Sequence, residues 1–419
     1  MENKTNYQAE LFSNRLKKKY KELRKWARKN SISAYRLYDR DIPEIPVSLD
    51  LYEFLPEEIK SPEECAAYQK SILSAISSNN PAAEKELELN RYAVLYLYER
   101  PYEKDPAEEE EWLSRMAETA SSVLNIELSH IVKKERKQQK GLNQYEKIES
   151  KTSIVHNIQE NNLIFKIDLS KYLDTGLFMD HRPLRKTIQE TSAQKRVLNL
   201  FCYTGSFSAY AAAGNAAYVE SVDLSNTYLS WAEENLKKNG FCSKEKYRFT
   251  KADVIEWLKN KALHIQEKDK FDIIILDPPT FSNSKSTLNV LDINRDWPEL
   301  VKNAVSLLNT NGILYFSTNS TRLSFDEKKL PKNTDFTDIT AQSVPKDFEG
   351  TLYPDGMEKV PKPIAIVQAN RFMIQRSDYL ISYCFKGIGN TWNFVDYAQK
   401  LETDIYTLED IIKSLKKPK

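Results

Sequence analysis

The sequence predicts an α/β protein whose larger part is a doubly wound, mostly parallel β-sheet. From about Leu163, short apolar segments alternate with helical segments, which is typical of repeated strand–helix units. Tight turns or aspartates directly follow successive apolar segments, as at the ligand-binding edge of such a sheet. The residues before Leu163 lack this alternation. We therefore expect an α+β domain over residues 1–165 and the doubly wound domain over residues 166–419.

Length and composition exclude several other classes of protein. A chain of 419 residues suits two domains, given about 150 residues for each. Hydrophobic residues make up 41% and charged residues 29%, which excludes a disordered or fibrous chain. No apolar run reaches the roughly 20 residues of a membrane span, and the first residues contain no secretory signal. The four cysteines (Cys65, Cys202, Cys242 and Cys384) form no CxxC pair, so we expect a cytoplasmic protein without disulfides or a bound metal.

The first domain is expected to contain helices at its beginning and end, with strands between them. Between Glu10 and Asn30, apolar residues recur every three or four positions, as in an amphipathic helix. Segments rich in Tyr, Leu and Val predict strands at Ala34–Tyr38, Val47–Phe54 and Tyr92–Glu99. A further helix is expected at Ala107–Leu124.

Two basic segments lie in this domain, although the net charge of the chain is only +1. Residues 15–29 carry nine Lys or Arg and one acid, and residues 133–140 form a second basic run. The like charges within each cluster repel one another, which favours an anionic partner. The apolar stripe of the first helix is expected to pack against the domain, which leaves its basic side chains for that partner.

The second domain is expected to alternate strands with helices. The strands are expected at Val197–Phe201, Tyr218–Val222, Tyr247–Thr250, Phe271–Leu276 and Ile313–Ser317. Ser225 is a suitable N-cap and Gly240 a suitable end for the helix after the second strand. The other expected helices follow the first strand, ending near Gly214, and precede the last strand, over residues 297–308.

Candidate ligand-binding residues follow these strands in order. They are the turn Tyr203–Ser206, Asp223, Asp253 and Asp277. A carboxylate at the end of the second strand can accept hydrogen bonds from both ribose hydroxyls of a nucleoside. The first turn contains a single glycine, Gly205, whereas a pyrophosphate cradle requires G-x-G-x-x-G. A nucleoside with a small charged tail therefore fits better than NAD, and S-adenosylmethionine (SAM) is such a ligand.

Asp277, Pro278, Pro279 and Thr280 form the most specific motif. The two prolines fix an extended turn and remove two N–H donors. The remaining carbonyls and the carboxylate are acceptors suited to holding a flat heterocycle edge-on.

The sequence resembles the RlmK-type 23S rRNA guanine-N7 methyltransferases, which correspond to the C-terminal half of bifunctional RlmKL. The resemblance covers most of residues 9–325. The segments that carry it are Asn199–Ser206, Val222–Ser225, Trp231–Gly240 and Asp277–Ser284, with Asn14–Leu16, Lys25–Arg28, Tyr35–Asp39, Gly141–Tyr145 and Tyr172–Arg182 upstream. Residues 326–375 match the family poorly.

This resemblance implies a Rossmann-like class I SAM-dependent methyltransferase that acts on 23S rRNA or a large-subunit precursor. It implies that Asp180, His181 and Arg182 lie beside the cofactor. The residues that it implies to contact or frame the cofactor are Asn199, Phe201, Tyr203, Thr204, Gly205, Asp223, Leu224, Asp253 and Asp277. The acceptor end would consist of Asp277, Pro278, Pro279 and Thr280.

The residues also bear on which atom is methylated. Methylation at pyrimidine C5 needs a cysteine nucleophile, which related enzymes carry just after the fifth strand. Here that place reads Phe316–Ser320, and Cys202 and Cys384 are expected to be structural. Amine methylation usually places an aromatic residue where Thr280 stands. Guanine N7 has a free lone pair and needs only alignment, which this site can supply.

The basic segments would hold the RNA backbone while Phe281 or Tyr203 stacks on an extruded base. The expected RNA-binding residues are Arg15, Lys18, Arg24, Lys25, Arg28, Lys133, Lys134, Arg136, Lys137 and Phe281. The alternatives are another SAM-dependent rRNA base methyltransferase, acting on guanine N2 or cytosine C5, and a non-catalytic RNA-binding assembly factor. A small-molecule methyltransferase would leave the basic helix unexplained. The sequence makes no prediction of oligomeric state.

Overall fold

The computed structural model describes residues 2–42, 44–78, 80–98, 105–136, 153–282, 291–320, 323–349, 379–382, 395, 397–401 and 404–407. The chain forms two compact units, Met1–Glu349 and Gly350–Lys419. In the second unit, β14 (Tyr379–Ser382) and β15 (Asp404–Thr407) pair in parallel. None of the described helices combines the length and hydrophobicity that a membrane span requires. The expected division at residue 165 lies inside the first unit and stays a prediction.

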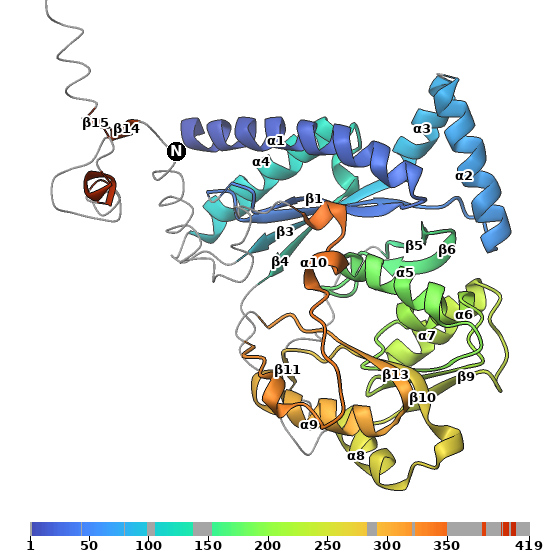
Figure 1. Cartoon of the computed structure of the whole chain (residues 1–419). Coiled ribbons are helices and arrows are strands. Elements are labelled where there is room, and N and C mark those ends of the chain that lie inside the picture. Colours follow the sequence, from blue (N-terminus) through green and yellow to red (C-terminus); the bar gives the residue numbers. More distant parts are fainter. Residues whose placement is uncertain are drawn as a thin grey trace, which may run out of the picture. The chain divides into compact units, whose positions relative to one another are not determined.

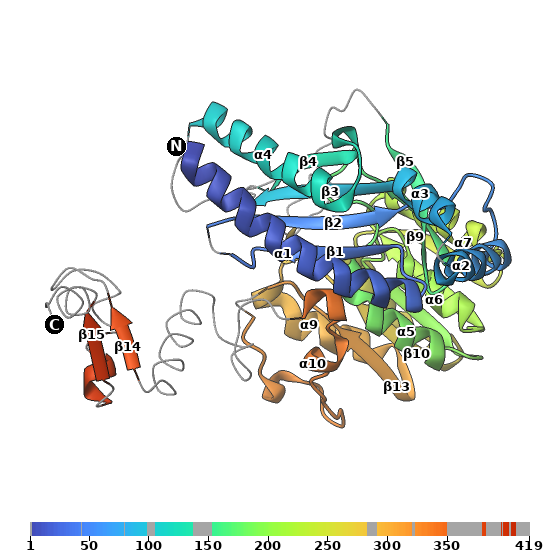
Figure 2. The same cartoon turned by 90° about the horizontal axis from the view of Figure 1, so that it is seen from above.

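The N-terminal part of the first unit is a four-stranded sheet covered on one face by two helices (Figure 1). Strands β1 (Ala34–Asp39), β2 (Val47–Glu53) and β3 (Arg91–Tyr98) are antiparallel, and β4 (Ile131–Arg136) pairs in parallel with β3. A parallel neighbour requires a crossover, which is α4 (Pro106–Leu124). Helix α1 (Glu2–Lys29) lies beside α4 on the same face of the sheet (Figure 2).

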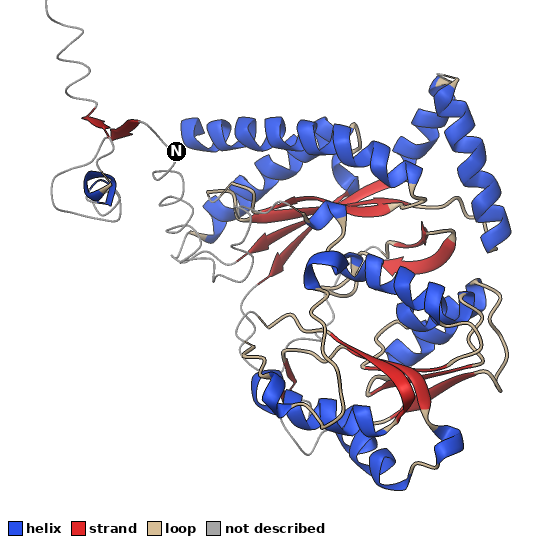
Figure 3. Ribbon diagram, in the orientation of Figure 1, coloured by secondary structure: helices blue, strands red, loops and turns tan. Residues whose placement is uncertain are grey.

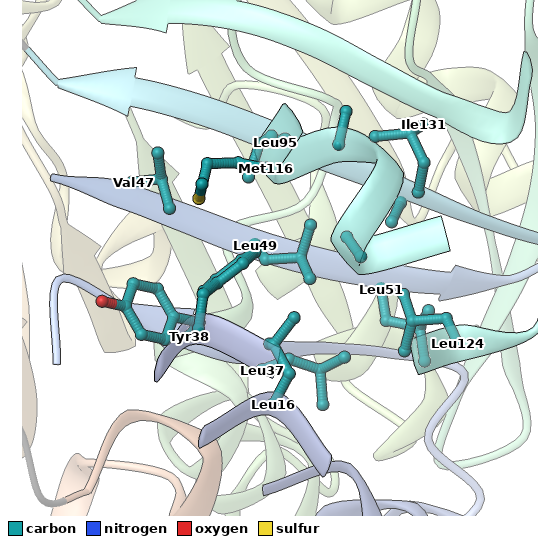
Figure 4. Packing of buried hydrophobic residues seen from close by; sticks show 14 of the residues in the cluster. Leu16, Leu37, Tyr38, Val47, Leu49, Leu51, Leu95, Met116, Leu124 and Ile131 are labelled. Atoms are coloured by element: carbon teal, nitrogen blue, oxygen red, sulfur yellow. The ribbon is translucent and has the colours of Figure 1, made fainter. Parts of the chain in front are cut away.

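The core between these two helices and the sheet confirms the expected apolar stripe of α1. Leu16 of α1 and Met116 of α4 are fully buried against β1 and β2 (Figure 4). Every residue of β2 is buried, because helices cover one of its faces and the rest of the unit covers the other. Burial of apolar area in this core is a main source of stability.

Several elements of this part, including two helices and a hairpin, were not foreseen from the sequence. Helices α2 (Pro62–Ser77) and α3 (Pro81–Leu89) connect β2 to β3. Strands β5 (Val155–Glu160) and β6 (Leu163–Asp168) form an antiparallel hairpin. Asn161 and Asn162 in its two-residue loop have φ of 52° and 63°, which is the backbone that a type I′ turn requires and that Asn tolerates.

The doubly wound sheet that the sequence predicts is present, with helices packed around it (Figure 3). Its strand order is β13-β10-β7-β8-β9, and all its pairs are parallel. Its strands are β7 (Arg196–Leu200), β8 (Tyr218–Asp223), β9 (Tyr247–Lys251), β10 (Phe271–Leu276) and β13 (Leu308–Phe316). Its helices are α5 (Arg182–Thr191), α6 (Ser206–Ala213), α7 (Asn226–Lys238), α8 (Val254–His264) and α9 (Ile293–Ser306). The short pair β11 (Phe281–Ser282) and β12 (Leu291–Asp292) lies between β10 and α9.

Helices cover both faces of this sheet, because successive side chains of a strand point to opposite faces. Val197 of β7 packs with α5 and α6, and its neighbour Leu198 packs with α8 and α9. The hairpin β5–β6 packs between the N-terminal sheet and helices α6 and α7. The two parts of the first unit therefore share one of the apolar clusters.

A buried network of charged side chains also joins the two parts, and its centre is Glu160 at the end of β5. Arg182 Nε and Arg185 Nε of α5 each donate to this carboxylate at 2.8 Å, and Tyr210 Oη of α6 donates at 2.9 Å. Arg182 Nη1 also donates to Asp347 at 2.7 Å. Asp347 belongs to the short helix η6 (Lys346–Phe348), which follows the doubly wound sheet in the chain.

The same network reaches three backbone groups that matter for the site. Arg182 Nη2 donates to the carbonyl of Ala34 in β1, and Asp347 accepts from the N–H of Arg36. Arg185 Nη1 donates to the carbonyl of Phe178 at 2.6 Å. One carboxylate therefore fixes the N-terminal sheet, α5 and the segment before α5 relative to one another.

Replacing Glu160 by Gln is expected to lower the free energy of unfolding by about 3–5 kcal/mol, because the buried arginines lose a counter-charge. Urea unfolding of the purified protein measures this change. Glu233→Gln is the matched control: Glu233 pairs with Lys237 on the exposed surface of α7, so its loss should have little effect. An equal effect of the two variants would contradict the structural role of Glu160.

The effect should also depend on pH. Burial raises the pKa of Glu160, but Arg185 and Arg182 outweigh burial and hold that pKa below its ordinary value of 4.5. The network therefore stabilises the protein fully above that value, and this stabilisation is lost as the pH falls through the lower pKa of the folded state. The difference between the wild type and Glu160→Gln should shrink over this acidic range.

Candidate active site

The carboxyl ends of the five parallel strands meet at one edge of the doubly wound sheet. Strand pairing places Leu200 of β7 beside Val222 of β8 and beside Leu276 of β10. The turn after β7, Asp223 at the end of β8 and Asp277 after β10 are therefore neighbours along this edge. Asp253 follows β9 at the same edge. The structure thus brings together the four positions that the sequence singles out.

The turn after β7 has an unusual backbone. Phe201, Tyr203 and Gly205 have φ of 55°, 49° and 71°, a region that residues other than glycine rarely adopt. Such strain persists only where the surroundings hold it, and it is concentrated at functional sites. Here Thr204 Oγ1 donates to the carbonyl of Gly176 at 2.6 Å, and Asn235 Nδ2 of α7 donates to the carbonyl of Thr204 at 2.9 Å.

Asp223 fastens the same turn from the neighbouring strand. Its Oδ2 accepts from the N–H of Tyr203 at 3.0 Å, and its Oδ1 accepts from the N–H of Ser225 at 2.9 Å. Burial raises the pKa of Asp223, while hydrogen bonds from backbone N–H groups lower it in part. Each carboxylate oxygen has capacity for a further bond, so the group can still accept from ribose hydroxyls. Leu224, which follows it, is half-buried.

Asp253 is the N-cap of α8. Its Oδ1 accepts from the N–H groups of Ile255 at 3.0 Å and Glu256 at 3.5 Å. Capping of this kind stabilises the helix end. The expected contact between Asp253 and the cofactor stays a prediction.

Asn199 is buried within the sheet below the turn. Its Nδ2 donates to Ser208 Oγ of α6 at 2.9 Å, and Ser208 in turn bonds Ser221 of β8. Asn199 therefore supports the turn from behind by joining β7, α6 and β8.

Asp277 is held from two sides at the end of β10. Its Oδ1 accepts from Ser317 Oγ at 2.5 Å, and its Oδ2 lies 3.7 Å from His181 Nε2. His181 belongs to the short helix η3 (Met179–His181) and packs edge-on against the ring of Phe207. The family resemblance implies that His181 lies beside the cofactor, which stays a prediction, and the sequence did not single out Ser317. Its position directly after β13 was the available signal.

The residues after Asp277 become progressively more exposed. Pro278 is buried, Pro279 and Thr280 are half-buried, and the side chain of Phe281 is 44% exposed. The carbonyl of Thr280 accepts from the N–H of Ile293, which fixes the loop against the start of α9. An exposed aromatic ring next to a fixed loop can stack on a base.

Asp180 and Arg182 flank His181, and they differ in environment. Asp180 is half-buried on η3, whereas Arg182 is buried and its guanidinium donates to Glu160, Asp347 and Ala34. Arg182 therefore supports the site by anchoring the segment that carries His181. Direct contact of Asp180 or Arg182 with the cofactor stays a prediction.

The basic residues expected to bind RNA fall into two groups. The arginines of α1 are paired with acids: Arg15 with Asp41 at 2.5 Å, and Arg24 and Arg28 with Glu84 at 3.1 and 2.9 Å. Lys18 and Lys25 are exposed. Among the expected residues of α1, the lysines are therefore exposed, whereas these arginines are half-buried in ion pairs.

The second basic segment is only partly described. Lys133 forms an ion pair with Glu110, and Arg136 pairs with Asp174 at 3.1 Å. Lys134 is buried, which lowers its pKa to about 8, and it donates to the carbonyls of Tyr172 and Leu173. Lys134 and Arg136 thus join β4 to the segment that leads into η3. Lys137 lies outside the described residues.

The environment of the cysteines argues against a thiolate nucleophile among the described residues. Cys202 lies in the turn after β7, where burial and then the charge of Asp223 raise the pKa of its thiol well above its ordinary value. Cys65 is buried in the N-terminal part, and Cys242 follows α7 at the opposite edge of the sheet. Cys384 lies outside the described residues. Within the described chain, no three His, Cys, Asp or Glu side chains are grouped to hold a metal ion.

Counted along the chain, the five parallel strands lie in the order 5-4-1-2-3. The first strand ends in a strained turn and the second ends in an acid. Together these features define a class I SAM-dependent methyltransferase. A family model of S-adenosylmethionine-dependent methyltransferases matches residues 94–326. The chain is 42% identical over 337 residues to ribosomal RNA large subunit methyltransferase K of Neisseria meningitidis serogroup B, covering 80% of this chain and 83% of that protein. The chain therefore belongs to the S-adenosylmethionine-dependent methyltransferase family that includes this ribosomal RNA methyltransferase.

Other similar proteins are longer or more distant. Ribosomal RNA large subunit methyltransferase K/L of Magnetococcus marinus is 38% identical, and the match covers 81% of this chain but 41% of that protein. The methyltransferase SMU.776, solved in complex with SAH, has a TM-score of 0.58 at 21% identity and covers 81% of this chain and 77% of its own. A SAM-dependent methyltransferase from Streptococcus mutans gives 0.56 at 20% identity, covering 82% and 77%. These two structures show the same fold.

Replacing Gly205 by Ala is expected to weaken SAM binding and stability together. An added Cβ would lie 2.6 Å from Ala232 Cβ of α7, in addition to the unfavourable φ of 71°. Gly240→Ala is the matched control, because Gly240 has φ of 80° but no atom near an added Cβ. The control should cost only the left-handed backbone penalty of about 1–2 kcal/mol.

Urea unfolding and calorimetric titration with SAM measure both effects. Gly205→Ala should lose more stability than Gly240→Ala and should bind SAM more weakly. If the two variants lost the same free energy of unfolding and Gly205→Ala bound SAM with an unchanged dissociation constant, the packing of α7 against the turn would not shape the cofactor site.

Proposed function

We propose that the protein transfers a methyl group from SAM to guanine N7 in 23S rRNA or a large-subunit precursor. The observation that carries this proposal is the strand-end site itself: a strained turn, Asp223 and the Asp277–Thr280 motif stand together, while burial raises the pKa of the Cys202 thiol in that turn. The names of the relatives support ribosomal RNA of the large subunit as substrate. The expected cytoplasmic location stays a prediction.

The residues present fit the cofactor. Asp223 would accept from the ribose hydroxyls, and the backbone of the turn Phe201–Gly205 would hold the methionine portion. The amino terminus of α6 begins at this turn and favours a carboxylate, because its first N–H groups have no partner within the helix. Asp253 would lie near the adenine amino group. SAM supplies an electrophilic methyl group on a positively charged sulfonium.

Guanine N7 suits a site without a nucleophile. The N7 lone pair lies in the plane of the base and carries no proton, so no base or covalent intermediate is required. The protein then needs to hold the base in line with the methyl group and to exclude water, and such positioning can supply about 7–11 kcal/mol. The half-buried Asp277–Thr280 loop would frame the base, and exposed Phe281 would stack on it.

RNA would bind along α1 through its lysines. Lys17, Lys21, Lys25 and Lys29 are exposed at a spacing of four residues, so they form a stripe along one side of the helix. Within the described chain, none of them is paired with an acid. The arginines of α1 hold the helix to the domain, so phosphate contacts would come from the lysine stripe.

Methyl transfer from labelled SAM to unmodified 23S rRNA tests the proposed function. Digestion of the product to nucleosides should give 7-methylguanosine, and Asp277→Ala should reduce this product at least tenfold. Asp223→Ala should also weaken SAM binding, which calorimetry measures. Asp326→Ala, which removes only the cap of the surface helix η5, is the matched control and should leave both unchanged.

Other outcomes distinguish the remaining functions. N2-methylguanosine or 5-methylcytidine would contradict the N7 assignment and retain the enzyme class. RNA binding without transfer, unaffected by Asp223→Ala, would favour an assembly factor.

Replacing Lys17, Lys21 and Lys25 together by Ala is expected to weaken RNA binding and its dependence on salt. Each lost phosphate contact lowers the slope of log K against log salt by about 0.7 for single-stranded RNA, so the triple variant should lose about 2. Fluorescence anisotropy with an rRNA fragment at several salt concentrations measures this slope. The matched control replaces Lys244, Lys246 and Lys268, which are exposed elsewhere. An equal loss in both triple variants would contradict a role for α1.

A further inference from the structure

We propose that Ser317 is a positioning residue that sets the orientation of the Asp277 carboxylate in the methyl-transfer site. This inference rests on the proposed function, because it assumes that Asp277 lies at the acceptor end of the site. Ser317 comes directly after β13, and Asp277 comes directly after β10. No feature of the sequence motif connects the two residues, which are 40 positions apart.

Strand pairing explains why the two side chains meet. Leu276 and Phe316 are partners in the parallel pair β10–β13, so the residues that follow them emerge side by side. The N–H of Ser317 donates to the carbonyl of Leu276 at 3.1 Å and extends the ladder by one bond. The backbone of Ser317 is therefore fixed independently of any contact that its side chain makes.

The hydroxyl then fixes one oxygen of the carboxylate. Ser317 Oγ donates to Asp277 Oδ1 at 2.5 Å, a distance typical of a hydrogen bond from a hydroxyl to an ionised carboxylate. Such bonds are stronger than those between neutral groups. Rotation of the carboxylate would break this bond, so Oδ1 is held toward β13.

The other oxygen remains available to a ligand. Asp277 Oδ2 lies 3.7 Å from His181 Nε2, which is longer than a hydrogen bond. The Asp277 side chain is 27% exposed, so a bound molecule can reach it. Ser317 therefore leaves Oδ2 on the side of His181 in η3, where it can act on the cofactor or the base.

A double-mutant cycle tests the proposal. Ser317→Ala should lower the single-turnover rate of methyl transfer roughly tenfold or more, because a hydrogen bond to a charged group is lost. Ser317→Thr keeps the hydroxyl and should recover most of the rate. In Asp277→Asn the charge is absent, so adding Ser317→Ala should cause little further loss. Ser320→Ala is the matched control: this hydroxyl in the same loop donates to Asn294, and its removal should leave the rate unchanged.

Two outcomes would overturn the inference. In the first, Ser317→Ala behaves like the wild type although Asp277→Asn is impaired. In the second, the losses of Ser317→Ala and Asp277→Asn add fully, which would show that Ser317 acts through the loop and not through the carboxylate. Full activity of Asp277→Asn and Asp277→Ala would instead contradict the placement of Asp277 in the proposed site. Failure of the inference and failure of the proposed function are thus separate results.

Discussion

The buried carboxylate of Glu160 is the constraint on which the rest of the first unit depends. It accepts from Arg182, Arg185 and Tyr210, and it sits at the end of the hairpin between the N-terminal sheet and the doubly wound sheet. Apolar contacts alone would tolerate small shifts between these two parts. Charged groups removed from water need their partners at fixed distances, since an unpaired buried charge is very unfavourable. The network therefore fixes how the two parts pack.

This network also determines the geometry of the candidate active site from a distance. Arg185 holds the carbonyl of Phe178, and Arg182 begins α5 immediately after His181. The short helix η3 is therefore anchored at both ends, and His181 is held beside Asp277. On the other side of the edge, Asp223 and Asn235 hold the strained turn after β7. The site is preorganised by residues that need not touch the substrate.

The sequence predicted the fold class and most strand positions because these depend on local pattern. Apolar strands with aspartates at their ends indicate a parallel sheet, and the edge of such a sheet brings those aspartates together. The roles of Arg182, Lys134 and Ser317 could not be predicted in this way. Their partners, Asp347, Tyr172 and Asp277, lie 165, 38 and 40 residues away, so only the folded chain reveals the contacts. The hairpin β5–β6 was missed because Asn161–Asn162 was not recognised as a turn.

On helix α1, arginine and lysine have different roles because their charged groups differ in shape and hydration. A guanidinium offers several donors in a plane and matches a carboxylate, so arginine suits a fixed, half-buried ion pair. Arg24 and Arg28 share Glu84 in this way and attach α1 to α3. A lysine ammonium is strongly hydrated and flexible, so it suits contacts with a polyanion that follow no fixed geometry. The arginines therefore hold α1 in place against the domain. Because α1 is fixed in this way, its lysine stripe can remain exposed to a phosphate backbone.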